Sequence, residues 1–108
     1  MSAIVTKNDN IIQKIVDKIV DSISPDKIIL FGSQAKGKIN QDSDIDILVI
    51  WDTELNPHKR NVYLSRLFPH RDFSLDIFAF TNKEYSQLKD IPGTIIYEAF
   101  QNGKILYG

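Results

Sequence analysis

Three short apolar segments, separated by polar and helix-like stretches, constrain the fold of this chain more than any other feature. They are Ile28–Phe31, Ile45–Trp51 and Phe73–Phe80. Their lengths and their β-branched and aromatic residues are typical of buried strands. Because an apolar sheet must be covered, the segments between them are expected to supply helices that pack on it.

Two helices are predicted by periodicity and by their ends. The first has one apolar face, with Asn8 to Asn10 as candidate N-caps and Pro25 as its stop; that face contains Ile11, Ile12, Ile15, Val16, Ile19, Val20 and Ile23. The second begins at Asn56-Pro57 and ends at Pro69. Its predicted buried stripe contains Tyr63, Leu64, Leu67 and Phe68.

The C-terminal part of the chain is expected to add two further helices and an edge strand. Thr81 and Glu84 form a capping box for a short helix, and Pro92 is expected to open a last helix that ends at Asn102-Gly103. Lys104–Tyr107 reads as a short edge strand. This alternation predicts an α/β or α+β sheet flanked by helices, in a single domain over residues 1–108.

Composition excludes several classes of protein. The formal net charge of −1 argues against general binding to nucleic acids or anionic membranes. The absence of cysteine excludes disulfides, cysteine-ligated zinc and thiol catalysis. The N-terminus lacks the apolar core of a signal peptide, and no apolar run is long enough to span a bilayer. We therefore expect a soluble cytoplasmic domain.

Asp44 and Asp46 are the residues that point most clearly to chemistry. They lie two positions apart at the start of a strand, so both carboxylates face one side of the sheet. Two carboxylates this close repel each other unless one is protonated or a cation lies between them. Oxygen ligands of this kind suit Mg²⁺ or Mn²⁺. A solvated Asp- and Ser-rich turn explains Asp42 well, but it explains Asp46 poorly, because an apolar run follows Asp46 directly.

Asp76 is a third candidate ligand, in the middle of a later strand. A buried aspartate there requires a partner or a metal. The alternatives are an ion pair with Arg71 or Lys27, or a strand face open to solvent. If its strand lies beside that of Asp46, three carboxylates converge, which is the layout that holds two divalent ions against a nucleoside triphosphate.

Gly32 and Ser33 form a candidate phosphate site after the first strand. Glycine allows close approach of the backbone, and N–H groups and a hydroxyl at a helix start bind phosphate. Lys36 could also contact the triphosphate. The spacing from Gly32 to Lys38 imitates a P-loop, but Ile39 stands where Ser or Thr is needed.

Taken together, Gly32-Ser33, Ser43-Asp44-Ile45-Asp46 and the later Asp76 resemble the signature of the DNA polymerase β-like nucleotidyltransferase superfamily. The chain is most similar to the minimal nucleotidyltransferases, which are single short domains. Lys36 stands where members often carry Arg, and Ile39 and Asn40 replace a stretch that often holds another basic residue.

The resemblance implies a small mixed sheet flanked by helices and transfer of AMP from ATP to an acceptor hydroxyl, with release of pyrophosphate. It implies that Asp44 and Asp46 hold two Mg²⁺ ions, that Asp76 holds the ion near the attacking hydroxyl, and that Gly32 and Ser33 hold the terminal phosphates.

Similar minimal proteins are antitoxins paired with a helical HEPN ribonuclease toxin, and the implied acceptor is a tyrosine of that partner. Two other functions stay open: a binding protein that neutralises its partner by steric contact, and an enzyme that modifies a small molecule such as an aminoglycoside. The sequence leaves open whether the chain forms homo- or hetero-oligomers.

Overall fold

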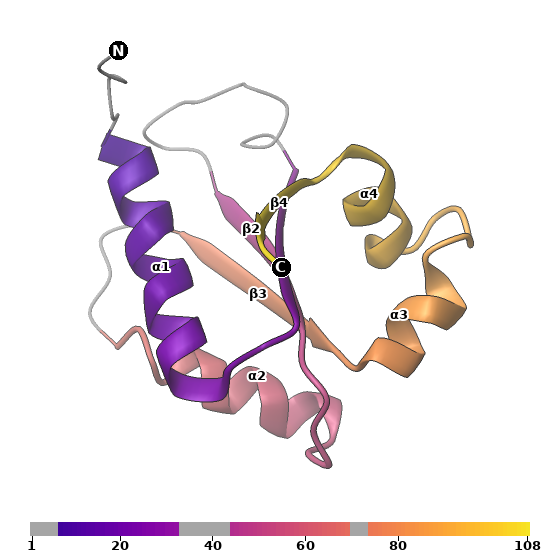
Figure 1. The fold of residues 1–108 in the computed structure, drawn as a ribbon, viewed down its shortest axis with the longest axis horizontal. Coiled ribbons are helices and arrows are strands. Elements are labelled where there is room, and N and C mark those ends of the chain that lie inside the picture. The colour runs from indigo at the N-terminus through magenta and orange to yellow at the C-terminus, as the bar shows by residue number, and fades with distance from the viewer. Residues whose placement is uncertain (1–6, 33–43, 70–73) are drawn as a thin grey trace.

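The computed structural model describes residues 7–32, 44–69 and 74–108. Within these residues the elements follow in the order α1 (Lys7–Ile23), β1 (Lys27–Phe31), β2 (Ile45–Ile50), α2 (Pro57–Ser65), β3 (Leu75–Phe80), α3 (Asn82–Leu88), α4 (Ile95–Asn102) and β4 (Lys104–Tyr107). The strands lie in the middle of the molecule, with α1 and α2 to one side and α3 and α4 to the other (Figure 1). All three predicted strands form, and so does the predicted strand at Lys104–Tyr107.

The described strands form one mixed sheet with the order β3-β2-β1-β4. β1 pairs antiparallel with β2 and with β4, whereas β2 and β3 run parallel. A parallel pair requires a crossover connection, and α2 lies in the segment that makes it. This arrangement confirms the expected mixed sheet flanked by helices.

The two faces of the sheet are covered by different helices, and the strand alternation decides which side chain meets which helix. Ile45, Ile47 and Val49 of β2 belong to the core that includes the buried face of α1. Leu48 and Ile50 belong to a second core that includes Ile96 and Ala99 of α4. Because side chains alternate along a strand, the face that carries Leu48 also carries position 46.

Helix ends were predicted well where a side-chain cap was recognised. Asn56 accepts a hydrogen bond from the Lys59 N–H at 2.9 Å, and Thr81 and Glu84 form the expected capping box of α3. Two predicted starts are wrong. α1 begins at Lys7, so the Asn8–Asn10 segment lies inside the helix. α4 begins at Ile95, because Thr94 caps it through the Tyr97 N–H, and Pro92 lies in the preceding turn.

The prediction for the buried stripe of α2 is partly wrong. Leu64 is fully buried, but Tyr63 is 43% exposed, and Leu67 and Phe68 are only half-buried. Arg60 is buried instead, with 6% of its surface exposed.

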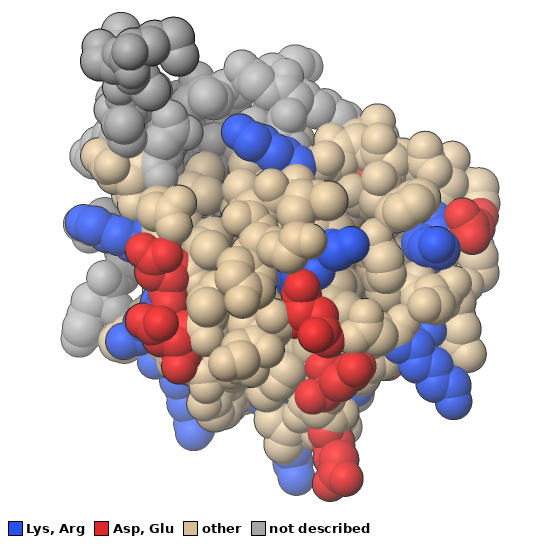
Figure 2. Space-filling view, in the orientation of Figure 1, with Lys and Arg blue, Asp and Glu red and all other residues tan. Residues whose placement is uncertain are grey.

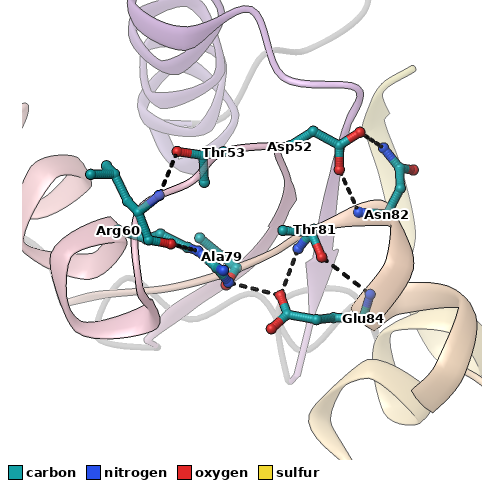
Figure 3. Close-up of polar contacts among 8 residues, drawn as sticks. Asp52, Thr53, Arg60, Ala79, Thr81, Asn82 and Glu84 are labelled. Atoms are coloured by element: carbon teal, nitrogen blue, oxygen red, sulfur yellow. Dashed lines mark hydrogen bonds and ion pairs between the residues drawn. The ribbon is translucent and has the colours of Figure 1, made fainter.

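The guanidinium of Arg60 is buried because its donors find partners from three segments (Figure 3). Its Nε donates to the carbonyl of Leu55 at 2.8 Å, and one terminal nitrogen lies 2.7 Å from the carboxylate of Glu84 and 3.4 Å from the carbonyl of Ala79. The pair therefore ties α2 to the start of α3. Burial of a charged group is tolerated when its hydrogen bonds are made in this way.

Replacing Glu84 by Gln is expected to destabilise the fold, because it leaves the Arg60 charge buried without its counter-charge. The carboxylate is one-third exposed, so we expect a loss of about 1–2 kcal/mol rather than the larger loss of a fully buried pair. Urea unfolding at pH 7 measures it, with Glu54→Gln, at an exposed carboxylate, as the control. An unchanged unfolding midpoint would show that Glu84 contributes nothing.

The same pair predicts how this loss depends on pH. Burial alone raises the pKa of Glu84, but hydrogen bonds from Thr81 and the charge of Arg60 outweigh it and hold that pKa below its usual value. A depressed pKa stabilises the fold above the unfolded-state value of about 4.3, and this contribution is lost as the pH falls through the folded-state pKa. The difference between wild type and Glu84→Gln should therefore shrink in acid.

Charges on the surface agree with a chain of nearly zero net charge. On the face shown in Figure 2, acidic and basic side chains are interspersed among uncharged ones, and no broad basic area covers it. None of the helices in the described ranges is long and apolar enough to cross a membrane.

Candidate active site

Asp46 and Asp76 lie side by side at the start of the two parallel strands. The register of β2 and β3 pairs these two residues directly, and their carboxyl groups share a hydrogen bond. Both lie on the sheet face that carries Leu48 and Phe78, which is the face covered further along by α4. The predicted convergence of these two carboxylates is therefore present in the structure.

The electrostatics of the pair are those of crowded like charges. The pKa of Asp46 is raised, first by its partial burial, then by the negative charges of Asp76 and Asp44, and by a hydrogen bond that its protonated carboxyl donates to Asp76. Asp44 and Asp76 are exposed, so the pair is open to solvent on its outer side. The expectation that Asp76 is buried is therefore wrong, and the alternative of a strand face open to solvent holds at this position. The charges of Asp44 and Asp76 thus both act on Asp46.

Gly32 makes room for the central carboxylate. It follows Phe31, which pairs with Asp46 across β1 and β2, and its φ of +76° lies in the left-handed region that favours glycine. A Cβ atom at this position would lie 2.5 Å from Oδ2 of Asp46, well inside van der Waals contact. Sequence reasoning expected this glycine to approach phosphate, and the structure adds that it permits the position of the Asp46 side chain.

Ser33 and Lys36, the other predicted phosphate ligands, lie outside the described residues, and so does Arg71. Lys27, the other alternative partner of Asp76, is not one: its register partner is Ile50, at the far end of the sheet, and its ammonium lies 5.8 Å from the centre of the Tyr85 ring.

The Asp46–Asp76 pair offers part of the ligand set of a divalent cation. Across the described ranges, no three His, Asp or Glu side chains are already arranged as a set of metal ligands. The Asp46–Asp76 pair nevertheless has the chemistry that Mg²⁺ prefers, because it offers only oxygen donors and carries a repulsion that a cation would relieve. Asp44 lies close enough to act on the same charge.

An aromatic contact beside the carboxylates was missed by sequence reasoning. Phe78 follows Asp76 by two residues on the same face of β3, and its ring centre lies 5.8 Å from that of Phe31. Phe31 is almost fully buried, whereas Phe78 is half-buried. The spacing of two residues between Asp76 and Phe78 could have indicated that Phe78 lies on the same face as the carboxylates. The contact of Phe78 with Phe31 could not be predicted, because it depends on the strand order.

Comparison with known proteins shows the family and the fold of the chain. The family described as "Polymerase beta, Nucleotidyltransferase" matches residues 13–108. A Sulfolobus solfataricus protein assigned as a nucleotidyltransferase has a similar structure, with a TM-score of 0.62 and 21% identity over 89% of this chain and 76% of that protein. A chain in a toxin–antitoxin structure with AMP-PNP is also similar, with a TM-score of 0.55 and 21% identity over 89% of this chain and 73% of that one. Curated proteins gave no match. Because the family match spans most of the sequence, the chain belongs to the polymerase β nucleotidyltransferase family.

Proposed function

We propose that this chain transfers AMP from ATP to a hydroxyl group of a partner protein, and that this modification makes it the antitoxin of a helical HEPN-type ribonuclease toxin. The observation that carries the proposal is the direct pairing of Asp46 with Asp76, beside a glycine that makes room for the first. A nucleotidyltransferase needs carboxylates at one point to hold the ions that bind a triphosphate.

The positions of the residues support the following roles. Asp44 and Asp46 would hold Mg²⁺, which when bound neutralises charge on the triphosphate and on the attacking and leaving oxygens. Asp76 lies on the outer, exposed side of the pair, where its carboxylate can orient the acceptor hydroxyl and accept its proton. The hydroxyl oxygen forms a bond to the α-phosphorus as the bond to the bridging oxygen of the β-phosphate breaks. Pyrophosphate then leaves.

The choice of a protein acceptor is supported by the openness of the site. Asp44 and Asp76 are both exposed, so another molecule can bring a hydroxyl group directly to the carboxylates. The similarity to a chain in a toxin–antitoxin structure containing AMP-PNP supports a toxin as that molecule and an adenine nucleotide as the donor. The resemblance to the minimal nucleotidyltransferases implies that the acceptor is a tyrosine of a HEPN protein.

Labelled ATP tests the proposal. The chain is incubated with ATP labelled on the α-phosphate, Mg²⁺ and the protein encoded by the adjacent reading frame. We expect the label on a tyrosine of the partner, and no label with the Asp44→Asn plus Asp46→Asn variant. Equal labelling by wild type and variant, or none by either, would reject the proposed transfer.

The same proteins separate the competing functions. If the double variant still neutralises the partner in growing cells, steric contact and not transfer provides the antitoxin effect. If wild type transfers AMP to an aminoglycoside with no partner present, the acceptor is a small molecule. Only loss of both labelling and neutralisation in the variant supports the antitoxin enzyme.

A further inference from the structure

The outward surface of α2 carries two adjoining cavities of about 430 and 550 Å³. Both are lined by His58, Val62 and Arg66, and the larger also by Lys59 and Tyr63. We refer to these five residues as the α2 surface. It lies away from the carboxylates, because Leu64 of α2 packs in the core on the opposite sheet face.

α2 departs from an ordinary surface helix because one charged side chain is buried and one aromatic side chain is exposed. Arg60 is buried, whereas Tyr63 is 43% exposed and Val62 is half-buried on the outer side. The Tyr63 ring is not loose, because its centre lies 5.7 Å from that of Trp51. A fixed, half-exposed tyrosine next to an arginine is the combination found at energetic centres of protein interfaces.

The charge of the α2 surface has one sign. Residues 55–69 contain no Asp or Glu, although the chain as a whole has a net charge of −1. Lys59 and Arg66 are exposed on either side of the apolar centre, while the charge of Arg60 is already paired with Glu84 inside the fold. A partner that covers this surface must bring apolar side chains for the centre and acidic ones for the rim.

We propose that the α2 surface docks an amphipathic helix of the partner protein, with its apolar face on Val62 and Tyr63 and its acidic residues against Lys59 and Arg66. An apolar groove along a helix is a standard seat for such a segment. Two exposed cations around an apolar centre are too few for a nucleic acid, which is held by a wide basic area. A helix docked here leaves Asp46 and Asp76 open on the other face, so the partner can be held while its hydroxyl is modified.

The inference rests on the proposed function, because the partner is the protein that presents the acceptor. The test measures binding, by calorimetry at 50 and 300 mM salt, between this chain and the protein of the adjacent reading frame. We expect Lys59→Glu plus Arg66→Glu to weaken binding at least about tenfold and to flatten its salt dependence. Tyr63→Ser is expected to weaken binding about tenfold as well, with no change in salt dependence.

Two controls separate the outcomes. Lys14→Glu plus Lys18→Glu makes the same charge change on the exposed side of α1 and should leave binding unchanged. Asp44→Asn plus Asp46→Asn should bind normally while losing transfer. If the partner binds and is labelled but the α2 variants bind like wild type, the docking surface is wrong and the proposed function stands. If wild type does not bind the partner, both fail. If the α2 variants instead abolish self-association of the chain, the surface joins two copies and the proposal is overturned.

Discussion

Asp46→Asn is expected to lower the rate of AMP transfer by about a thousandfold or more and, without divalent cations, to raise the melting temperature. The rate falls because the asparagine amide carries no negative charge and binds divalent cations weakly. The cations then stabilise less of the charge that develops on the reacting phosphate. Stability rises because burial and the charges of Asp76 and Asp44 disfavour the ionised form of Asp46, as its raised pKa records. Thermal unfolding and labelled-ATP kinetics measure the two effects.

The matched control is Asp52→Asn, two residues beyond the opposite end of the same strand. Asn82 donates to both oxygens of this carboxylate, at 2.9 and 3.0 Å, and these hydrogen bonds lower the pKa of Asp52. Removing its charge should therefore lower the melting temperature and leave transfer intact. Mg²⁺ should raise the melting temperature of wild type and of Asp52→Asn but not of Asp46→Asn. A destabilised Asp46→Asn protein would contradict the repulsion inferred at the site.

Gly32→Ala is expected to reduce transfer by about a hundredfold and to destabilise the fold by about 1–2 kcal/mol. The backbone at Gly32 has a φ of +76°, which costs an alanine free energy, and the added Cβ would lie 2.5 Å from Oδ2 of Asp46. The carboxylate of Asp46 must then turn away from Gly32, and its distance from Asp76 changes. Single-turnover kinetics and urea unfolding measure the two parts.

Gly93→Ala separates these effects. Gly93 also has a left-handed backbone, with a φ of +91°, but no atom lies within 4 Å of a Cβ built there. It should show the loss of stability without the loss of transfer. If both alanine variants lose activity equally, the backbone conformation and not the room for Asp46 explains the requirement for glycine.

Much of the fold could be predicted because its signals are local. The apolar segments gave the strands, and the caps at Asn56 and at Thr81 with Glu84 gave two helix starts. The pairing of Asp46 with Asp76 could be anticipated only as a condition on strand order, because nothing near either residue determines that their strands are neighbours. The structure meets that condition through the parallel register of β2 and β3.

The errors also have a physical cause. The burial of Arg60 could not be predicted, because its partner Glu84 lies 24 positions away on another element. The guanidinium takes a place on the inner side of α2 beside Leu64, whereas Tyr63 is exposed, so the expected stripe is only partly realised. Gly32 was predicted to approach phosphate. Its closeness to Asp46 could not be predicted, because it depends on the antiparallel register of β1 and β2.

The parallel junction of β2 and β3 also has a consequence for the order of folding. Asp46 and Asp76 are register partners although 30 positions separate them, so a growing polypeptide has no such pair until the loop between them is closed. Their mutual repulsion opposes the last step of this closure. The pairing of the apolar residues of β2 and β3 from Ile47 onward must therefore drive that step. The end of the sheet that carries Asp46 and Asp76 should therefore pair last during folding and separate first during unfolding. A bound cation would stabilise the pairing at this end.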